Sequence, residues 1–408
     1  MAEQQRYRVI KRLAAGGMAE VFVAESAGIE GFKKRVAIKR VLPQLSRKDQ
    51  FIAMFLDEAR LSAQLSHSNV VSVFDIGVGD GSYFIVMEYV EGADLKAVMD
   101  HWRELQRPIP VEQAVFIAAK ICQGLAYAHE LTNAEGRHLQ IIHRDVTPAN
   151  VLITKYGEIK IVDFGLAKAS SQLAASEQGV IKGKFGYLAP ETVLEQPVDH
   201  RVDVFAVGII LWELLAGRRL FLGKTDFETV RQVMQTVIPP IRELNPDVPE
   251  ELLPILLRGL ARNQNDRYFT AREFGRDLTA FLYWWGRSVS EYEVGELVRS
   301  AMGLETAHLD TTQRIAEMID LMLLEFKSLA SDDEPAPVSA YQPEGMGMSS
   351  FEQEASSVDE PLGNLADLLE GTETDDSALH MDPDPEPEQA DEQPQQQQKG
   401  WFRSLLQR

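Results

Sequence analysis

Three features in the first sixty residues could together bind phosphate groups. The stretch LAAGGMAEVF at residues 13–22 is glycine-rich and lies between β-prone runs. Such a loop lets backbone amides approach phosphate oxygens, because no side chain stands in the way. Lys39 in VAIK lies eighteen residues beyond Val21, where its cation could pair with nucleotide phosphates, and Glu58 follows on a helical pattern where it could hold that lysine in place. Each feature alone is more often a turn or a solvated surface charge, so further motifs are needed to identify a phosphate-binding site.

Further motifs follow in order. HRDVTPAN occupies residues 143–150, and downstream lie DFG, with Asp163 thirteen residues after Asn150, APE at 189–191, DVFAVG with Asp203 and Gly208, and Arg267 in NDRY. One such motif arises easily by chance, but this whole series of elements in register does not. Their order and spacing resemble the protein kinase family over about residues 7–285, and in detail a bacterial serine/threonine kinase of the eukaryotic (Hanks) type.

The resemblance implies a catalytic role for each matching residue. Asp145 would orient the attacking hydroxyl and accept its proton, while Asn150 and Asp163 would hold the magnesium ions that bridge the phosphates of ATP. Lys39, clamped by Glu58, would grip the inner phosphates. The cofactors that the resemblance implies are therefore ATP and Mg²⁺.

The resemblance also implies how the nucleotide is held. The phosphate loop would consist of Leu13, Ala14, Ala15, Gly16, Gly17, Met18, Ala19, Glu20 and Val21. The adenine would lie between Leu13, Val21, Ala37 and Leu152, with Met87 at the back and the backbone of Glu88 and Val90 along its polar edge. Asp94 is expected to contact the ribose.

Two departures from the family pattern are mild. Ala14 and Ala19 stand where the family has glycines, which leaves Gly16 as the match. Alanine is small, so we expect a stiffer phosphate loop rather than a broken one. The insertion LTNAEGRHLQ at 131–140, before the catalytic loop, is expected to be a polar surface turn.

Thr147 is the third departure. Serine/threonine kinases usually have a lysine two residues after the catalytic aspartate, near the transferring phosphoryl group. A charge contact at 4 Å is worth about 4 kcal/mol at an effective dielectric of 20, and losing half of it would slow the reaction about thirtyfold. In GKFGYLAPE at 183–191, Lys184 stands where these kinases usually have a threonine. We predict that Lys184 reaches the site vacated at Thr147 and acts in catalysis; the alternative is an exposed loop lysine in a slower enzyme.

Regulation is implied by Arg144, which precedes the catalytic aspartate. By resemblance it belongs to a basic pocket that an activation-loop phosphate could fill. No threonine lies between residues 165 and 183, but Ser170, Ser171 and Ser176 are available. The sequence leaves open whether these serines are autophosphorylated or the enzyme is constitutively active. Arg267 and Glu191 are expected to form a buried structural ion pair.

The elements that must position these residues form two groups. Residues 7–90 carry short β-rich runs separated by Gly, Ser and Asp, with one helical stretch at 49–66. Residues 94–285 are mostly helical, with strand-like pieces at NVLITKY and IKIVDFG. The expected fold is α+β: a bilobal protein kinase, with a small antiparallel β-sheet N-lobe carrying one helix and a larger α-helical C-lobe.

Composition is that of a soluble globular protein, with 45% hydrophobic and 25% charged residues in 408. The only cysteine, Cys122, lies in an apolar helical pattern and is expected to be a buried hydrophobe. The N-terminal residues lack the apolar core of a secretory signal. The apolar run at 204–217 is too short to span a bilayer and fits a buried core helix. We therefore expect a cytoplasmic protein without a membrane span.

The segments after the kinase domain differ in chemistry. Residues 286–330 place apolar side chains at helical spacing and are expected to form a helical extension. Residues 331–398 contain 19 Asp and Glu and no Lys or Arg, so most of the net charge of −21 lies there; their composition predicts an acidic disordered linker. This segment is interpreted as a solvated tether, which could deliver the basic and apolar end at 399–408 to a partner or back to the kinase. Membrane binding by that end is the alternative, and it would be weak. No nucleic-acid partner is expected.

The function that this resemblance implies is ATP-dependent phosphorylation of protein Ser and Thr hydroxyls in bacterial signalling, with autophosphorylation. The alternative from another class is a nucleotide-binding pseudokinase scaffold. Lys39, Glu58, Asp145, Asn150 and Asp163 are all present, whereas a pseudokinase typically lacks at least one of this set. A small-molecule kinase of the same fold is disfavoured by APE and the loop before it, which resemble a peptide-docking surface.

Overall fold

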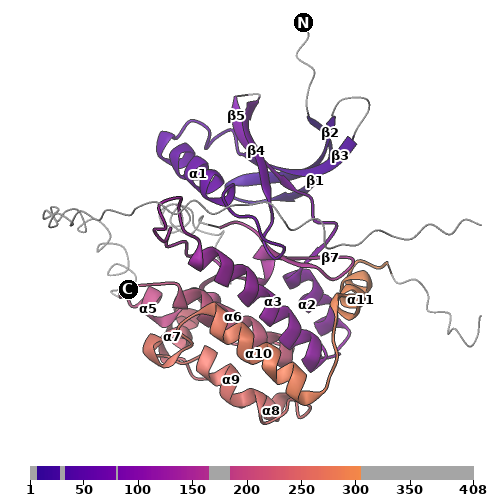
Figure 1. The fold of residues 1–408 in the computed structure, drawn as a ribbon, viewed down its shortest axis with the longest axis vertical. Coiled ribbons are helices and arrows are strands. Elements are labelled where there is room, and N and C mark those ends of the chain that lie inside the picture. Colours follow the sequence, from indigo (N-terminus) through magenta and orange to yellow (C-terminus); the bar gives the residue numbers. More distant parts are fainter. Residues whose placement is uncertain (1–6, 28–32, 80, 165–183, 305–408) are drawn as a thin grey trace, which may run out of the picture. The chain divides into compact units, whose positions relative to one another are not determined.

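The N-terminal lobe is built on a five-stranded antiparallel sheet (Figure 1). A computed structural model of the chain describes residues 7–27, 33–79, 81–164 and 184–304. The strands lie in the order β1 (Tyr7–Ala15), β2 (Ala19–Ala27), β3 (Lys33–Val41), β5 (Ser82–Glu88) and β4 (Val73–Gly79). Consecutive strands therefore pair as hairpins except where α1 (Asp49–Ser62) and the segment after it separate β3 from β4.

Helix α1 packs on this sheet through an apolar face of spacing four. Phe51, Phe55 and Ala59 are all buried and share a core cluster with Val41 of β3 and Ile85 of β5. Residues four apart lie on one face of an α-helix, so the same face brings the neighbouring Glu58 toward β3. The packing of α1 thus decides where this carboxylate points.

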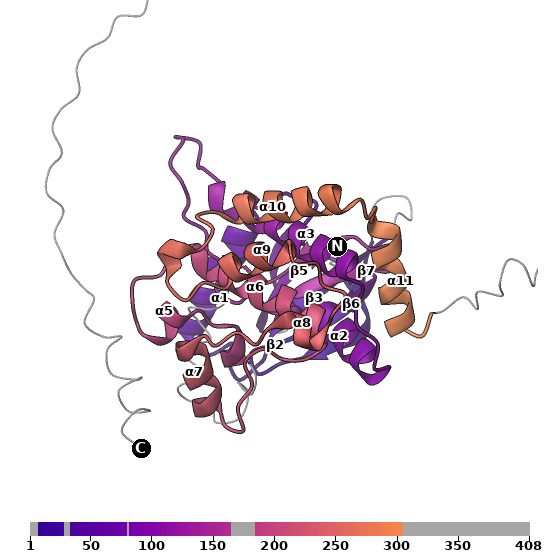
Figure 2. The same ribbon diagram turned by 90° about the horizontal axis from the view of Figure 1, so that it is seen from below.

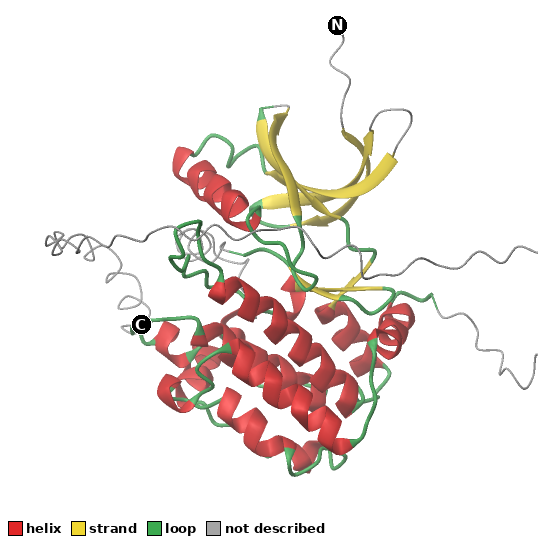
Figure 3. Cartoon of the chain, in the orientation of Figure 1, coloured by secondary structure: helices red, strands yellow, loops and turns green. Residues whose placement is uncertain are grey.

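A second, three-stranded sheet lies at the junction of the lobes (Figure 3). Its strands are β6 (Gly92–Asp94), β7 (Val151–Thr154) and β8 (Ile159–Ile161), paired antiparallel in that order. β7 begins directly after the 3₁₀ turn η2 (Pro148–Asn150). The hairpin β7–β8 therefore joins the catalytic loop to the DFG segment.

The C-terminal lobe is helical (Figure 2). Its helices are α2 (Leu95–Glu104), α3 (Val111–Glu130), α5 (Pro190–Val193), α6 (Arg201–Ala216), α7 (Asp226–Gln235), α8 (Ile241–Leu244), α9 (Leu252–Gly259), α10 (Ala271–Trp285) and α11 (Glu291–Ala301), with 3₁₀ turns η3 (Lys184–Tyr187) and η4 (Gln264–Asp266). α6 is buried along almost its whole length, between Val202 and Leu215, and packs against α3 and α9. The predicted core helix is confirmed, although it begins three residues earlier than the apolar run.

A buried ion pair links the APE motif to the loop before α10. Arg267 donates to both carboxylate oxygens of Glu191, over 2.5 and 2.7 Å, and their side chains are 0% and 3% exposed. Bidentate pairing of this kind satisfies charges that would otherwise be costly to bury. It fixes α5, and with it the turn η3 just before α5, against the lobe.

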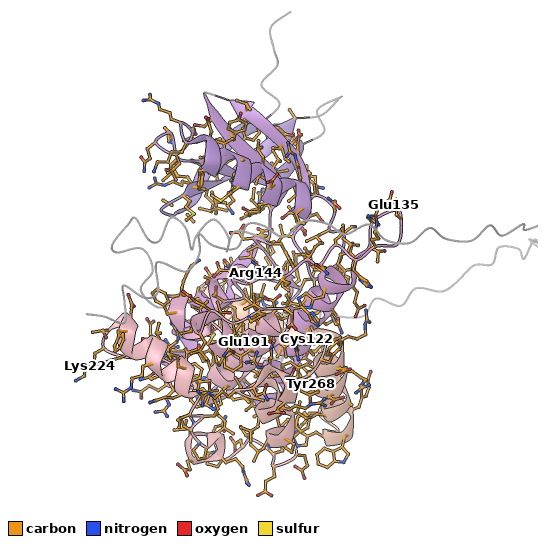
Figure 4. All side chains as sticks on the ribbon, turned by 90° about the vertical axis from the view of Figure 1, so that its left-hand side faces the viewer. Cys122, Glu135, Arg144, Glu191, Lys224 and Tyr268 are labelled. Carbon is orange, nitrogen blue, oxygen red and sulfur yellow. The ribbon has the colours of Figure 1, made fainter. Side chains whose placement is uncertain are left out.

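The predicted α+β bilobal fold is confirmed. Cys122 is fully buried, as predicted, and burial raises the pKa of its thiol, which keeps it protonated. The insertion at 131–140 forms a largely exposed turn closed by a bridge between Thr132 and His138, with Glu135 at its tip (Figure 4). Ser170, Ser171 and Ser176, and the segments from residue 305 onward, lie outside the described residues.

Candidate active site

The backbone before Asp145 is held by a buried carboxylate of α6. Asp203 accepts hydrogen bonds from the backbone amides of His143 (2.9 Å) and Arg144 (2.8 Å), and from His129 Nε2 (2.8 Å). Burial acts to raise the pKa of Asp203, but the hydrogen bond and charge of His129 outweigh it and leave that pKa below its usual range. Arg144 has a φ of +64°, a strained conformation that these bonds maintain. Figure 4 places Arg144 on the side of the large lobe that faces the small lobe.

Asp145 is bonded from two sides. Asn150 Nδ2 donates to its backbone carbonyl (2.8 Å) and to its carboxylate Oδ2 (3.0 Å). Lys184 Nζ, from η3, donates to the same Oδ2 over 2.8 Å. Because both side chains use Oδ2, Oδ1 is the oxygen that we expect to face a substrate hydroxyl.

Thr147 closes the turn that carries Asn150. Its side chain is buried (6% exposed), and its carbonyl accepts the backbone amide of Asn150 at 2.9 Å. The next residue, Pro148, begins the 3₁₀ turn η2, a position where proline's missing N–H costs nothing. The cation beside Asp145 therefore comes from Lys184, 39 residues along the chain, and not from residue 147.

Lys39 lies between two carboxylates. Its Nζ is 2.7 Å from Asp163 Oδ1 and 3.4 Å from Glu58 Oε1, and its side chain is 8% exposed. Burial acts to lower the pKa of Lys39, but the charges of Asp163 and Glu58 outweigh it, so that pKa is raised and the lysine stays charged. Burial raises the pKa of Glu58 to about 8, and its Oε2 has no hydrogen-bond partner within the described residues. The lysine thus favours Asp163 over Glu58.

This geometry predicts a pH effect on the ligand-free protein. The pKa of Glu58 is about 8 in the fold against 4.5 ordinarily, so the folded state binds the proton more tightly than the unfolded state. The resulting stability is fully present below about pH 4.5 and is lost as the pH rises through about 8. We expect the melting temperature of the wild type to fall more steeply between pH 6 and pH 9 than that of Glu58→Gln. Glu130→Gln, at an exposed pair with Arg272, is the control; parallel curves for wild type and Glu58→Gln would disprove the effect.

The residues present fit magnesium. Asn150 and Asp163 supply one amide and one carboxylate, and Mg²⁺ prefers oxygen ligands, with the remaining positions filled by water and substrate phosphates. Asn150 donates through its nitrogen to Asp145, which leaves its oxygen as the ligand atom. Across residues 7–304, gaps aside, no group of three His, Cys, Asp or Glu side chains could hold a metal alone. This suits an ion shared between the protein and a nucleotide.

Five of the residues predicted to surround the adenine lie in one apolar cluster. Ala37 and Met87 are buried (6% exposed each), and the cluster also contains Val21, Val90 and Leu152. Met87 also lines a small cavity of about 20 Å³ with Lys39, Glu58 and Asp163, which agrees with a place at the back of the pocket. Leu13 is not in the cluster and is 45% exposed.

Four members of the apolar cluster were not predicted: Val71, Val73, Tyr89 and Val162. Tyr89 lies between Glu88 and Val90, and Val162 directly precedes Asp163. Their positions next to predicted residues in the sequence could therefore have identified Tyr89 and Val162 as members of the cluster. Val73 begins β4, which pairs with β5, and the backbone amide of Val71 donates to the carbonyl of Ile161 on β8 at 2.9 Å. Spacing alone reveals neither contact.

The glycine-rich loop forms the turn of the β1–β2 hairpin. The backbone amide of Gly16 donates to the carbonyl of Ala19 at 2.9 Å. The Glu20 carboxylate pairs with Arg40 (3.2 Å) and Arg12 (3.0 Å), and these guanidinium groups lower its pKa. Its expected contribution to phosphate binding is thus its backbone, since its carboxylate is already engaged.

Asp94 caps a helix. Its Oδ1 accepts the backbone amide of Ala97 at 2.8 Å, as the N-cap residue of α2. Its backbone pairs with Leu152, a member of the apolar cluster. The predicted ribose contact would use the other carboxylate oxygen.

A family model of the protein kinase domain matches residues 7–276. The chain belongs to the protein kinase family. The matched range covers both lobes and every candidate catalytic residue named above. The predicted resemblance to bacterial kinases of the eukaryotic type is confirmed. The match ends inside α10, so α11 lies beyond it.

The relatives include kinases named for two acceptor types. Tyrosine-protein kinase MasK of Myxococcus xanthus is 41% identical over 276 residues, which are 68% of this chain and 43% of that protein. Serine/threonine-protein kinase PrkC of Bacillus subtilis is 35% identical over 277 residues, 68% of this chain and 40% of that protein. The chain thus spans less than half the length of these curated relatives.

Among solved structures, the kinase domain of Mycobacterium tuberculosis PknI is 28% identical, with a TM-score of 0.50. The alignment covers 68% of this chain and 96% of that domain. No helix among the described residues has the length and apolar character needed to cross a membrane.

Proposed function

We propose that this chain is an ATP-dependent protein kinase that transfers the γ-phosphoryl group to Ser or Thr hydroxyls of proteins, in bacterial signalling and within the cytoplasm. The observation that carries the proposal is the convergence of Lys184 and Asn150 on Asp145, and of Lys39 and Glu58 near Asp163. These residues come from both lobes and from segments that lie far apart in the chain. Phosphoryl transfer needs positioning and charge stabilisation above all, and this arrangement supplies both.

The proposed reaction is an in-line displacement. The substrate hydroxyl forms a bond to the γ-phosphorus, the bond from that phosphorus to the bridging oxygen of ADP breaks, and the hydroxyl proton passes to Asp145 Oδ1. Lys184, at Oδ2 of the same carboxylate, orients Asp145 and places positive charge beside the reacting groups. Lys39 holds the inner phosphates, and Asn150 and Asp163 hold magnesium ions. When bound, these ions neutralise charge on the phosphates.

A nucleotide-binding pseudokinase scaffold is the alternative. It would not require a cation beside Asp145 or a turn that aims Asn150 at the same carboxylate. The presence of both contacts favours an active enzyme. If no acceptor received label from γ-labelled ATP, the scaffold would be favoured.

Tyrosine is the alternative acceptor, because the relative named as a tyrosine-protein kinase is 41% identical. We favour Ser and Thr because other relatives at 32–36% identity are named serine/threonine-protein kinases. A lysine at position 147 would have been a sequence signature of serine/threonine specificity, and Thr147 does not provide that signature.

One experiment distinguishes these functions. The full chain is incubated with γ-labelled ATP and Mg²⁺, alone and with a general protein acceptor, and the labelled residues are identified after acid hydrolysis. We expect phosphoserine or phosphothreonine; phosphotyrosine alone would overturn the acceptor assignment, and no label at all would overturn the enzyme. Mapping the label tests the proposed autophosphorylation at Ser170, Ser171 and Ser176.

The tail is proposed to deliver the kinase to a partner through residues 399–408. Support comes from composition alone: an acidic segment at 331–398 precedes a basic and apolar end. Removing residues 331–408 should then spare phosphorylation of a general peptide and slow that of the true substrate. If the truncation changed neither rate, residues 331–408 would be a tether without a docking role.

A further inference from the structure

Helix α11 lies outside the matched kinase domain yet is firmly packed. It begins with a capping box, in which Ser290 and Glu293 satisfy each other's backbone amides. Val294, Leu297 and Val298 on one face are 0–3% exposed. Figures 1 and 2 show α11 at the edge of the large lobe, beside α2 and the β6–β7 strands.

Side chains of the large lobe fix both ends of α11. Lys120 of α3 pairs with Glu291 at 3.4 Å, near the start of the helix. His101 of α2 hydrogen-bonds Ser300 at 3.1 Å, near its end. α11 is therefore fixed to the helical core of the lobe, and any other segment that α11 contacts is held relative to that core.

α11 also contacts the turn between β7 and β8. Gly157 has a φ of +94°, and a Cβ atom there would lie 1.6 Å from the carbonyl oxygen of Glu291. A Cβ atom on Gly295 would lie 3.0 Å from the carbonyl oxygen of Lys155, and Arg299 Nη1 donates to that same oxygen at 2.8 Å. Backbone meets backbone here, and only glycine permits the approach at residue 157.

The clamped hairpin joins the two residues proposed to hold magnesium. β7 begins immediately after Asn150, and β8 ends two residues before Asp163. The backbone of Val162 also donates to the carbonyl of Asn150 at 3.0 Å, which closes the hairpin at its open end. Leu152 on β7 belongs to the proposed adenine cluster and pairs with Asp94 on β6.

We propose that α11 is a positioning helix for nucleotide and magnesium binding, which clamps the turn of the β7–β8 hairpin and thereby fixes Asn150 relative to Asp163. The assignment rests on the proposed function for the identity of the ligand. Gly157 and Arg299 are positioning residues in this scheme, since they act through the hairpin and touch no reacting atom. The kinase unit of this chain then extends to α11, past the matched domain.

The test uses the full chain with Gly157→Ala and a matched control, Gly136→Ala. Gly136 also has a positive φ (+74°), but nothing lies within 4 Å of where its Cβ would be. Both substitutions carry the strain of a left-handed alanine, and only Gly157→Ala collides with α11. Hydrogen exchange of the amides at 151–161 in the ligand-free chain and calorimetric affinity for MgADP are measured at a temperature well below melting.

We expect Gly157→Ala to speed exchange across the hairpin and to weaken MgADP binding about tenfold, the lower end of what supporting residues of metal sites contribute. Gly136→Ala should change neither. Equal behaviour of the two variants, or a lowered melting temperature with unchanged MgADP affinity, would overturn the proposal. If Gly157→Ala does not fold, Arg299→Met decides: weaker MgADP binding supports the clamp, and wild-type binding overturns it. Neither readout requires phosphoryl transfer, so an inactive wild type would count against the proposed function alone.

Discussion

Phosphoryl transfer by the Asp145→Asn chain is expected to be about a thousandfold slower than by the wild type, within the range typical of a lost general base. Asparagine keeps the size of the side chain and can still accept from Asn150, so the loop should stay folded. It cannot take a proton, and it offers no negative charge to Lys184, which lies 2.8 Å from the carboxylate. The rate is measured with γ-labelled ATP and a saturating protein acceptor.

The affinity of Asp145→Asn for MgADP serves as its control. Asp145 lies outside the apolar cluster and is not proposed as a nucleotide contact, so that affinity should stay within about twofold of wild type. A variant that kept more than about a tenth of the wild-type rate would contradict the role of Asp145 as the base.

Lys184→Thr is expected to slow transfer about thirtyfold, on the estimate that half of a charge interaction of about 4 kcal/mol is lost. The contact to Asp145 Oδ2 gives this lysine a place that an ordinary loop lysine lacks, although its side chain is 53% exposed. Solvent screens an exposed charge, which is why we use half of the Coulomb value. In the kinetics, kcat should fall with little change in the KM for ATP.

Lys224→Thr is the matched control for Lys184→Thr. Lys224 is an exposed lysine of the same lobe, before α7 and far along the chain from the catalytic loop (Figure 4). Its removal changes net charge equally, so a general effect of charge would appear in both variants. Equal rates for Lys184→Thr, Lys224→Thr and wild type would make Lys184 a surface lysine.

The sequence predicted the fold well where a local pattern reflects burial. The run VFAVGIILWELLAG is apolar on every side because α6 is covered all round, and Phe51, Phe55 and Ala59 share one face because α1 packs on a sheet. The candidate catalytic residues were identified through the resemblance to protein kinases, which rests on short motifs. One of these motifs contains the 3₁₀ turn that runs from Thr147 to Asn150.

Long-range contacts were harder to predict. Val73 joins the apolar cluster through the pairing of β4 with β5, and Val71 is held by the hydrogen bond from its backbone amide to the carbonyl of Ile161 on β8. The sequence suggested that Glu58 holds Lys39, and the structure pairs them at 3.4 Å. The closer contact of Lys39 with Asp163, at 2.7 Å, joins residues 124 apart in the chain and was not predicted. A helical extension at 286–330 was expected, and α11 lies within it, yet the approach of α11 to Gly157 depends on two backbones meeting in space.

The most direct test of the catalytic arrangement is the rate of the doubly substituted chain, Thr147→Lys with Lys184→Thr, measured beside Lys184→Thr alone. The double variant returns the lysine to the catalytic loop. We predict that the double variant is at least about tenfold faster than Lys184→Thr alone, since a cation again lies beside the transferring phosphoryl group. A double variant no faster than Lys184→Thr, with wild-type melting temperature, would contradict the assignment of Lys184 as the replacement cation.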